Sequence, residues 1–174
     1  MRKLAIFFFI FLFNTQLLAV TSNPLESDEA LRSRIKIKFA LDPLLSKEKI
    51  TLQHQNGKLS LVGQVDNKII EEQALYLIQQ SNIQPDRIQN EIIVENKPLT
   101  PEKKQSLIEI AAKARLEAAS KYQMKNIPFI GIKLNYRNGV LVIKGHITKE
   151  QKKEIQEVLN NFKQINRINF SQEN

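Results

Sequence analysis

The chain has 174 residues, of which 25% are charged and 42% hydrophobic, and it contains no cysteine. This composition is typical of a globular protein and excludes a disordered chain, while the lack of cysteine excludes disulfides, thiolate metal sites and a lipid-modified N-terminal cysteine. The net charge of +8 at pH 7 is compatible with an anionic partner or with a solvated lysine-rich surface.

Residues 1–19 have the three parts of a secretory signal peptide. Met1–Lys3 is basic, Leu4–Phe13 is an unbroken apolar run, and Ala19 is a small residue suited to cleavage. The run is too short to span a bilayer, which needs about 20 residues, so a buried helix is the main alternative to a signal. We expect cleavage after Ala19 and export. An exported chain without disulfides favours the periplasm of a Gram-negative bacterium.

The first expected element after this segment is a helix over about residues 27–40. Leu31, Ile35 and Phe39 recur at the spacing of one helix face. Asp42-Pro43 follows and ends the helix, because proline cannot continue it.

Residues 50–65 read ITLQHQNGKLSLVGQV and predict a β-hairpin. Asn56-Gly57 stands between two stretches of alternating apolar residues, and both residue types tolerate the positive φ angles of a type I′ turn. Gly63 interrupts the second stretch, which indicates a β-bulge or a helix packed closely on the backbone.

A second helix and a third strand complete the first module, residues 24–95. Asp66 is the expected N-cap of the helix, and Arg87–Val94 is the expected strand. The apolar stripe of the helix consists of Ile70, Ala74, Leu77 and Ile78. Residues 96–100, which contain Pro98, are the expected linker.

The second module, residues 101–171, begins with a longer helix. Thr100-Pro101 is an N-cap followed by a first-turn proline, and the helix is expected to run to about Tyr122. Its expected inner face consists of Leu107, Ala111, Ala114, Ala118 and Tyr122.

Residues 132–147 read IKLNYRNGVLVIKGHI and repeat the first hairpin at a constant offset of 82 residues. Asn138-Gly139 matches the first turn, and Gly145 matches Gly63. Thr148, with Gln151 three residues later, predicts a capping box at the start of the next helix. The stripe of that helix consists of Ile155, Val158, Leu159 and Phe162. Residues 167–170 form the expected last strand.

The order in each module is therefore helix, strand, strand, helix, strand. Two helices can cover one face of a three-stranded sheet, so the predicted fold class is α+β, with two tandem αββαβ two-layer sandwiches. Modules of about 70 residues have small cores and modest stability.

The repeat resembles the BON domain, named after bacterial OsmY and nodulation proteins. The resemblance rests on NGKLSLVGQV at residues 56–65 and NGVLVIKGHI at residues 138–147, each between a helix and a helix-strand pair. The helix end at residues 39–42 is also similar to the end of the family's first helix. The second copy departs from the pattern, since no aspartate matches Asp42 and its last strand is short. A signal peptide followed by two such domains is similar to OsmY-like periplasmic proteins.

The resemblance implies a non-enzymatic envelope protein that attaches to anionic phospholipid or to other envelope proteins. It implies roles in envelope integrity, in stress responses or as a chaperone of exported proteins. It implies no cofactor and no catalytic residue.

The sequence itself offers no catalytic constellation. His54 and His146 belong to different modules and lack the spacing of metal ligands. Surface histidines without a function are the better interpretation. Glu71-Glu72 is an acidic pair whose side chains diverge by about 100° on a helix and cannot act on one substrate.

The basic residues of the second half are the best functional lead. Residues 24–95 hold 9 basic and 11 acidic residues, a net −2, whereas residues 96–174 hold 15 and 7, a net +8. The candidate contacts to anionic lipid are Lys103, Lys104, Lys121, Lys125, Lys149, Lys152 and Lys153. Each lysine at an anionic bilayer contributes about 1 kcal/mol. Ile127 and Phe129 are candidate apolar residues for the membrane interface, with a core position as the alternative.

Nucleic-acid binding and protein binding are the two alternative functions. The element order is similar to nucleic-acid-binding KH modules, but there is no G-x-x-G loop between helices, and export separates the chain from nucleic acid. A chaperone or protein-binding role is the main alternative to lipid binding, because exposed strand edges can pair with extended segments of clients.

Overall fold

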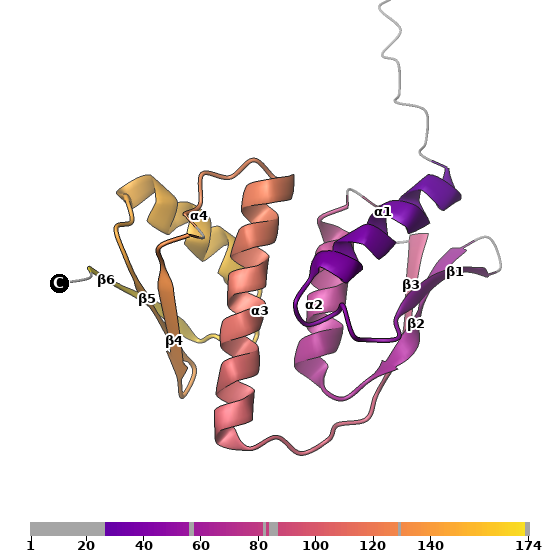
Figure 1. Ribbon diagram of the computed structural model, residues 1–174, viewed down its shortest axis with the longest axis horizontal. Helices are drawn as coiled ribbons and strands as arrows, with labels where there is room; N and C mark the ends of the chain where they lie inside the picture. Colours follow the sequence, from indigo (N-terminus) through magenta and orange to yellow (C-terminus); the bar gives the residue numbers. More distant parts are fainter. Residues whose placement is uncertain (1–26, 56–57, 82, 84–86, 129, 173–174) are drawn as a thin grey trace, which may run out of the picture.

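The computed structural model describes residues 27–55, 58–81, 83, 87–128 and 130–172. The first module contains five elements, which are α1 (Asp28–Leu41), β1 (Thr51–Gln55), β2 (Lys58–Val65), α2 (Lys68–Gln79) and β3 (Ile88–Val94). The second contains α3 (Pro101–Tyr122), β4 (Lys133–Arg137), β5 (Val140–Lys144), α4 (Lys149–Leu159) and β6 (Arg167–Ser171). The predicted α+β fold with two similar modules is confirmed (Figure 1).

Each module has a three-stranded mixed sheet with the hairpin's second strand in the centre. β1 pairs antiparallel with β2, and β2 pairs parallel with β3; β4, β5 and β6 repeat this order. Leu59, Leu61 and Val65 of β2 lie on the face that the helices cover, and each is at most 1% exposed. The other face of each sheet is turned away from the helices (Figure 1).

The second hairpin has the predicted turn. Asn138 has φ 50° and Gly139 has φ 84°, the positive angles that a type I′ turn requires at both central residues. Asn56-Gly57 of the first hairpin lies outside the described residues.

Gly63 adjoins neither a bulge nor a helix, so that prediction is wrong. The β2–β3 register is continuous from Leu59 to Val65, which leaves no extra residue. A Cβ atom on Gly63 would lie 2.6 Å from the carbonyl oxygen of Lys49. Glycine is therefore needed because the chain entering β1 crosses the backbone here. Gly145 is next to the equivalent segment of the second module, because a Cβ atom on it would lie 3.0 Å from the carbonyl oxygen of Gly131.

Side chains cap the helices as predicted in two of three places. Thr148 and Gln151 form the capping box of α4, and Thr100 accepts from the backbone of Lys103 at the start of α3. The N-cap of α2 is Asn67, however, because its side chain accepts from Ile69 N and Ile70 N. Asp66 instead forms an ion pair with Lys97, 2.6 Å away.

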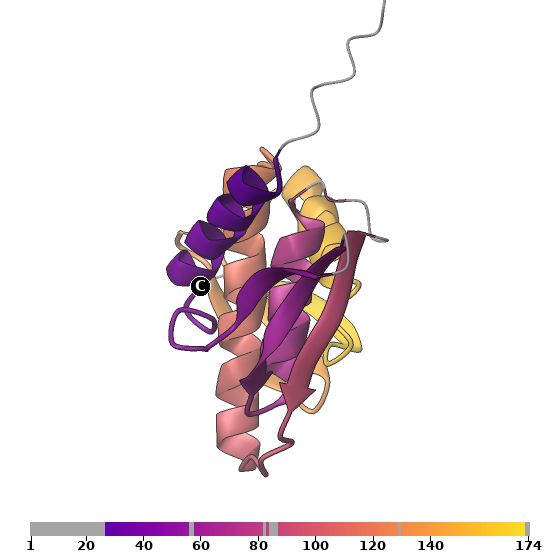
Figure 2. The same ribbon diagram turned by 90° about the vertical axis from the view of Figure 1, so that its right-hand side faces the viewer.

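The four helices lie between the two sheets, so the modules pack through their helices (Figures 1 and 2). α3 occupies the middle and is buried on two sides. Its residues at 0% exposure are Ile108, Ala111, Ala112, Leu116 and Ala119. Two residues of the expected inner face are not fully buried. Leu107 is only partly buried, and Tyr122 is 40% exposed. Ala114, Ala118 and Tyr122 line a crevice against α1 and α2.

A buried arginine joins the modules. Arg115 of α3 is 3% exposed, and its Nε donates to Gln73 Oε1 of α2 over 3.1 Å. Its guanidinium lies 4.0 Å from the ring centroid of Phe162 in its own module and 4.8 Å from that of Tyr76 in the other. Burial lowers the pKa of Arg115 to about 10, so the side chain remains charged at neutral pH.

Gln73 continues this network to the end of α1. Its Nε2 donates to Asp42 Oδ2 over 2.7 Å, while Oδ1 of Asp42 accepts from Leu44 N and Leu45 N. Burial raises the pKa of Asp42, although these hydrogen bonds oppose the rise. The network fixes the bend after α1 and ties it, through Arg115, to the second module.

Candidate functional site

The first two turns of α4 carry Lys149, Lys152 and Lys153, called here the lysine cluster. All three side chains are exposed, and no ion pair joins them to a carboxylate within the described ranges. Lysine at a helix N-terminus faces the positive end of the helix dipole, which is unfavourable for the helix. The capping box of Thr148 holds the helix start in spite of these charges. The cluster is therefore not explained by helix stability.

A shallow hollow lies beside the lysine cluster. It has a volume of about 480 Å³ and is lined by the cluster together with Glu150, Gln156 and Phe170. Lys152 Nζ lies 5.6 Å from the ring centroid of Phe170 on β6. The lining of the hollow thus combines three cations with one aromatic ring and one carboxylate.

Two other candidate lysines are already paired with carboxylates. Lys121 Nζ lies 2.5 Å from Glu117, whose hydrogen bond raises the pKa of Lys121. Lys125 Nζ lies 2.9 Å from Glu157 on α4, and the hydrogen bond from Lys125 lowers the pKa of that carboxylate. Lys125 thereby fastens the segment after α3 to α4, and it contributes little uncompensated charge.

The seven candidate lysines do not form one surface. Lys103 and Lys104 stand in the first turn of α3, at the opposite end of that helix from Lys121 (Figure 1). At 1.5 Å per residue, Lys103 and Lys121 are about 27 Å apart along the helix axis. Lys121 and Lys125 lie at the end that adjoins α4.

The described part of the segment between α3 and β4 exposes two apolar side chains, and Ile127 is not one of them. Ile127 is 4% exposed and belongs to the core, and Phe129 lies outside the described residues. Met124 is 94% exposed and Ile130 is 81% exposed. Lys125 of this segment pairs with Glu157 of α4, so the segment passes close to α4 on its way to β4 (Figure 1).

Sequence reasoning also missed a basic sheet face. Leu141 and Ile143 point to the helices, so the alternate residues of β4, β5 and β6 point away from them. The charged residues on this outer face are Lys133, Arg137, Lys144 and Arg167, all exposed and none acidic. Lys133 and Lys144 are cross-strand neighbours at the end of β5 from which the chain enters α4. The period-two alternation in the strands was the signal that would have found them.

The two histidines lie in different modules. His54 Nε2 lies 3.1 Å from Asp28 Oδ2, and Asp28 also pairs with Arg87 at 2.7 Å. His146 is exposed in the other module. Among the described residues, no group of three His, Cys, Asp or Glu side chains is placed to hold a metal ion. In this part of the chain, no helix has the length and apolar character needed to cross a membrane.

Comparison with known proteins identifies one domain. The family model of the BON domain matches residues 27–96. Two solved structures from Chlamydia trachomatis are similar: CdsD, a structural protein of the type III secretion system, at 14% identity and TM-score 0.34, and the CdsD C-terminal domain, at 18% and 0.30. Each alignment covers 84% of this chain, which spans 62% and 66% of those two chains. No curated protein matches the chain. The first module, residues 27–96, is therefore similar to the BON domain, and the second module is built on a similar plan.

Proposed function

We propose that this protein is a non-enzymatic adaptor of the bacterial envelope that docks on anionic phospholipid through the lysine cluster of its second module. The observation that carries the proposal is that Lys149, Lys152 and Lys153 are exposed, form no ion pair with a described carboxylate and line one shallow hollow. Two apolar side chains of the same module, Met124 and Ile130, are also exposed. BON domains are associated with phospholipid binding in envelope proteins, which supports it.

The charges are sufficient for reversible docking. Each lysine near an anionic surface contributes about 1 kcal/mol, so three provide about 3 kcal/mol, and Lys133 and Lys144 at the same end of the sheet add to the attraction. Met124 and Ile130 would enter the headgroup region, where an apolar side chain leaves water while its backbone stays at the surface. Docking of this kind weakens as salt screens the charges.

The location is part of the proposal. We place the mature protein in the periplasm because residues 1–19 have the pattern of a cleaved signal peptide. Those residues lie outside the described ranges, so the proposal rests on their sequence alone. Detection of the chain beginning at Val20 in a periplasmic fraction is the expected result, and an uncleaved chain in the cytoplasm would contradict it.

Vesicle flotation tests the docking surface. Wild-type protein is expected to float with vesicles that contain phosphatidylglycerol and to stay behind with phosphatidylcholine alone. The double variant Lys149→Glu/Lys152→Glu is expected to lose flotation. Its matched control is Lys103→Glu/Lys104→Glu, which changes the charge equally in the first turns of another helix and leaves the lysine cluster intact.

The control variant is expected to float like the wild type. Equal flotation with neutral vesicles, or equal losses in the two double variants, would contradict docking through the lysine cluster. Glutamate near a helix N-terminus is favourable for the helix dipole, so neither variant is expected to unfold.

A further inference from the structure

The two modules differ at the free edge of the hairpin, which is the side of β1 or β4 that pairs with no other described strand. In the second module, Glu109 of α3 accepts the backbone N–H of Tyr136 in the edge strand β4, over 2.7 Å. Gln105, one turn earlier, donates to the same carboxylate over 3.2 Å and holds it in place. A carboxylate of the same module thereby satisfies one outward-facing amide of the edge strand β4.

The first module has a cation where this carboxylate stands. Buried residues align the first helices of the two modules at an offset of 77 residues, since Leu31, Ile35 and Phe39 occupy the same positions as Ile108, Ala112 and Leu116. At this offset Glu109 corresponds to Arg32. A guanidinium has only donors, so Arg32 cannot accept an N–H from the strand.

The edge of β1 faces this cation. His54 of β1 matches Tyr136 of β4 in the repeated hairpins, and both strands pair on one side only. Outward-facing backbone groups alternate along an antiparallel edge strand, so Leu52 and His54 direct their N–H and C=O groups away from β2. Within the described part of the chain, β2 is the only strand that pairs with β1.

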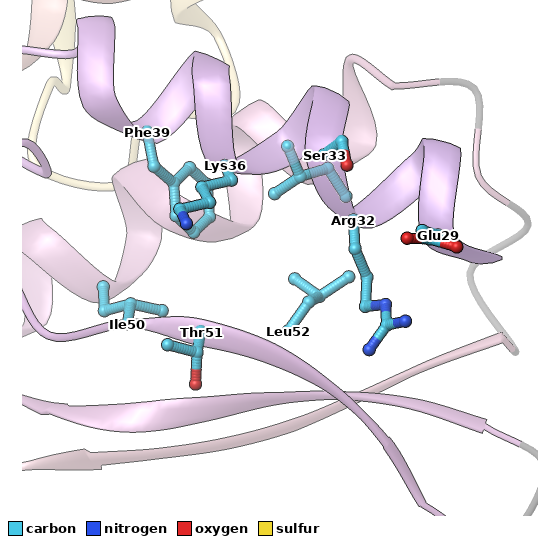
Figure 3. A pocket seen from close by; sticks show the side chains of 9 residues that line it. Glu29, Arg32, Ser33, Lys36, Phe39, Ile50, Thr51 and Leu52 are labelled. Carbon is cyan, nitrogen blue, oxygen red and sulfur yellow. The ribbon is translucent and has the colours of Figure 1, made fainter.

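An open groove of about 370 Å³ lies between this edge and α1 (Figure 3). Its apolar lining consists of Ile35, Phe39, Ile50 and Leu52. Arg32 extends from α1 toward the strand, and Lys36 stands one turn further along (Figure 3). Glu29 is the one acidic residue in the lining.

Arg32 and Lys36 are like charges at i and i+4, an arrangement that destabilises an isolated helix. Both are exposed, and neither forms an ion pair with a described carboxylate. The groove thus offers unpaired strand amides, an apolar lining and two cations within one site.

We propose that this groove binds an extended peptide carrying an acidic side chain, which adds as a strand to β1. The peptide backbone pairs with Leu52 and His54, its apolar side chains enter the groove, and its carboxylate meets Arg32 and Lys36. Glu109 in the second module serves as the internal example of a carboxylate on such an edge. Strand addition between a helix and an edge strand is an established mode of peptide recognition.

A lipid acyl chain fits this groove less well than a peptide. It would cover the apolar lining but leave the amides of Leu52 and His54 without partners, and burying an amide without a hydrogen-bond partner is unfavourable. The proposed peptide site uses no residue of the lysine cluster, so it stands or fails independently of membrane docking.

NMR titration of the whole protein tests the site. The probe is a short end-blocked peptide of alternating valine and glutamate, compared with its valine-lysine counterpart and with a version N-methylated at alternate residues. The valine-glutamate peptide is expected to shift the amide signals of Leu52 and His54 saturably. The lysine peptide and the N-methylated peptide are expected to bind at least about tenfold more weakly, because one loses the ion pair and the other the ladder hydrogen bonds.

Substitution of Arg32 sharpens the test. Arg32→Glu places a carboxylate where Glu109 stands in the second module, so it is expected to close the edge and weaken peptide binding by at least about tenfold. Lys113→Glu is the control, since Lys113 is exposed at the position on α3 that corresponds to Lys36; binding is expected to stay unchanged.

Three results would overturn the proposal. They are the absence of saturable shifts at β1, equal binding by Arg32→Glu, and shifts at β1 that phosphatidylglycerol vesicles cause but the peptide does not. The last result would assign the groove to lipid. Thermal melting of each variant shows whether a lost signal reflects unfolding, and the N-methylated peptide tests the pairing on the unmodified protein.

Discussion

The guanidinium of Arg115 lies 4.8 Å from the ring of Tyr76, and the two residues belong to different modules. The reverse pairing exists too, because the ammonium of Lys38 in the first module lies 4.5 Å from the ring of Tyr122 in the second. At the offset of 77 residues, Lys38 corresponds to Arg115. Each module therefore extends a buried cation from its first helix to an aromatic ring of the other, and the junction is an organised part of the protein.

Removing the arginine is expected to weaken the whole fold. Arg115→Met keeps most of the side-chain volume but leaves Gln73 Oε1 buried without its donor. We expect the free energy of unfolding in urea to fall by about 2 kcal/mol. Lys113→Met on the exposed side of α3 is the control and is expected to stay within about 0.5 kcal/mol of the wild type. Equal effects of the two variants would contradict a stabilising role for the junction network.

Asp42 gives the stability a defined pH dependence. Burial raises the pKa of Asp42 above its ordinary value of 3.8, so the folded protein holds this proton to higher pH than the unfolded chain does. The stability that Asp42 contributes is thus greatest at low pH and falls as pH rises through the raised pKa. In the variant Asp42→Asn the carboxyl group is replaced by an amide, which does not titrate, so this pH dependence is absent.

We therefore expect the difference in unfolding free energy, wild type minus Asp42→Asn, to decrease as the pH rises above the ordinary pKa of 3.8 and to level off once Asp42 is ionised in the folded protein. Urea unfolding of both proteins across this range measures it. A difference that increases with pH would show that the hydrogen bonds to Asp42 outweigh its burial.

The crossing at Gly63 predicts a steric effect. Gly63→Ala would place Cβ 2.6 Å from the carbonyl oxygen of Lys49, and backbone must move to relieve the contact. We expect a loss of about 1–3 kcal/mol in unfolding free energy. Gly131→Ala provides a comparison, because its Cβ meets nothing within 4 Å and only its positive φ of 79° is unfavourable. A smaller loss for Gly63→Ala than for Gly131→Ala would argue against the close crossing.

Local patterns in the sequence were sufficient for the elements and the repeat. The Asn138-Gly139 turn, the Thr148 capping box and the buried alternation of Leu59 and Leu61 each depend on neighbours along the chain, so the sequence contains the whole signal. Local patterns did not identify Asn67, the observed N-cap of α2, and predict Asp66 in its place. Both residue types are good caps, and the ion pair between Asp66 and Lys97 depends on a segment about thirty residues away.

The junction was beyond local patterns. α3 is buried against its own sheet and also against the first module, so its apolar residues do not reduce to one stripe. The sequence predicts Ala114 and Ala118 as core residues, and their neighbours are α1 and α2 across the junction. Nothing in the periodicity of one helix says which second surface it will meet.

The candidate surface was predicted in part, for the same reason. The lysine cluster is local to one helix start and could be identified from the sequence. The separation of Lys103 from it, and the exposure of Met124 and Ile130 in place of Ile127, depend on how α3 and the following segment fold over α4. The hydrogen bond from the backbone of Tyr136 to Glu109 likewise joins residues 27 positions apart.

The most direct test of the central claim is to find which side of the protein meets the membrane. The sequence has no cysteine, so Met124→Cys and Ile93→Cys can each carry one environment-sensitive fluorophore, at side chains that are 94% and 65% exposed. With phosphatidylglycerol vesicles, the label at position 124 is expected to shift to the blue and to be quenched by lipid-borne quenchers. The label at position 93, on the outer face of the first sheet, is expected to remain in water. Equal responses at the two positions, or a response at position 93 alone, would contradict docking through the second module.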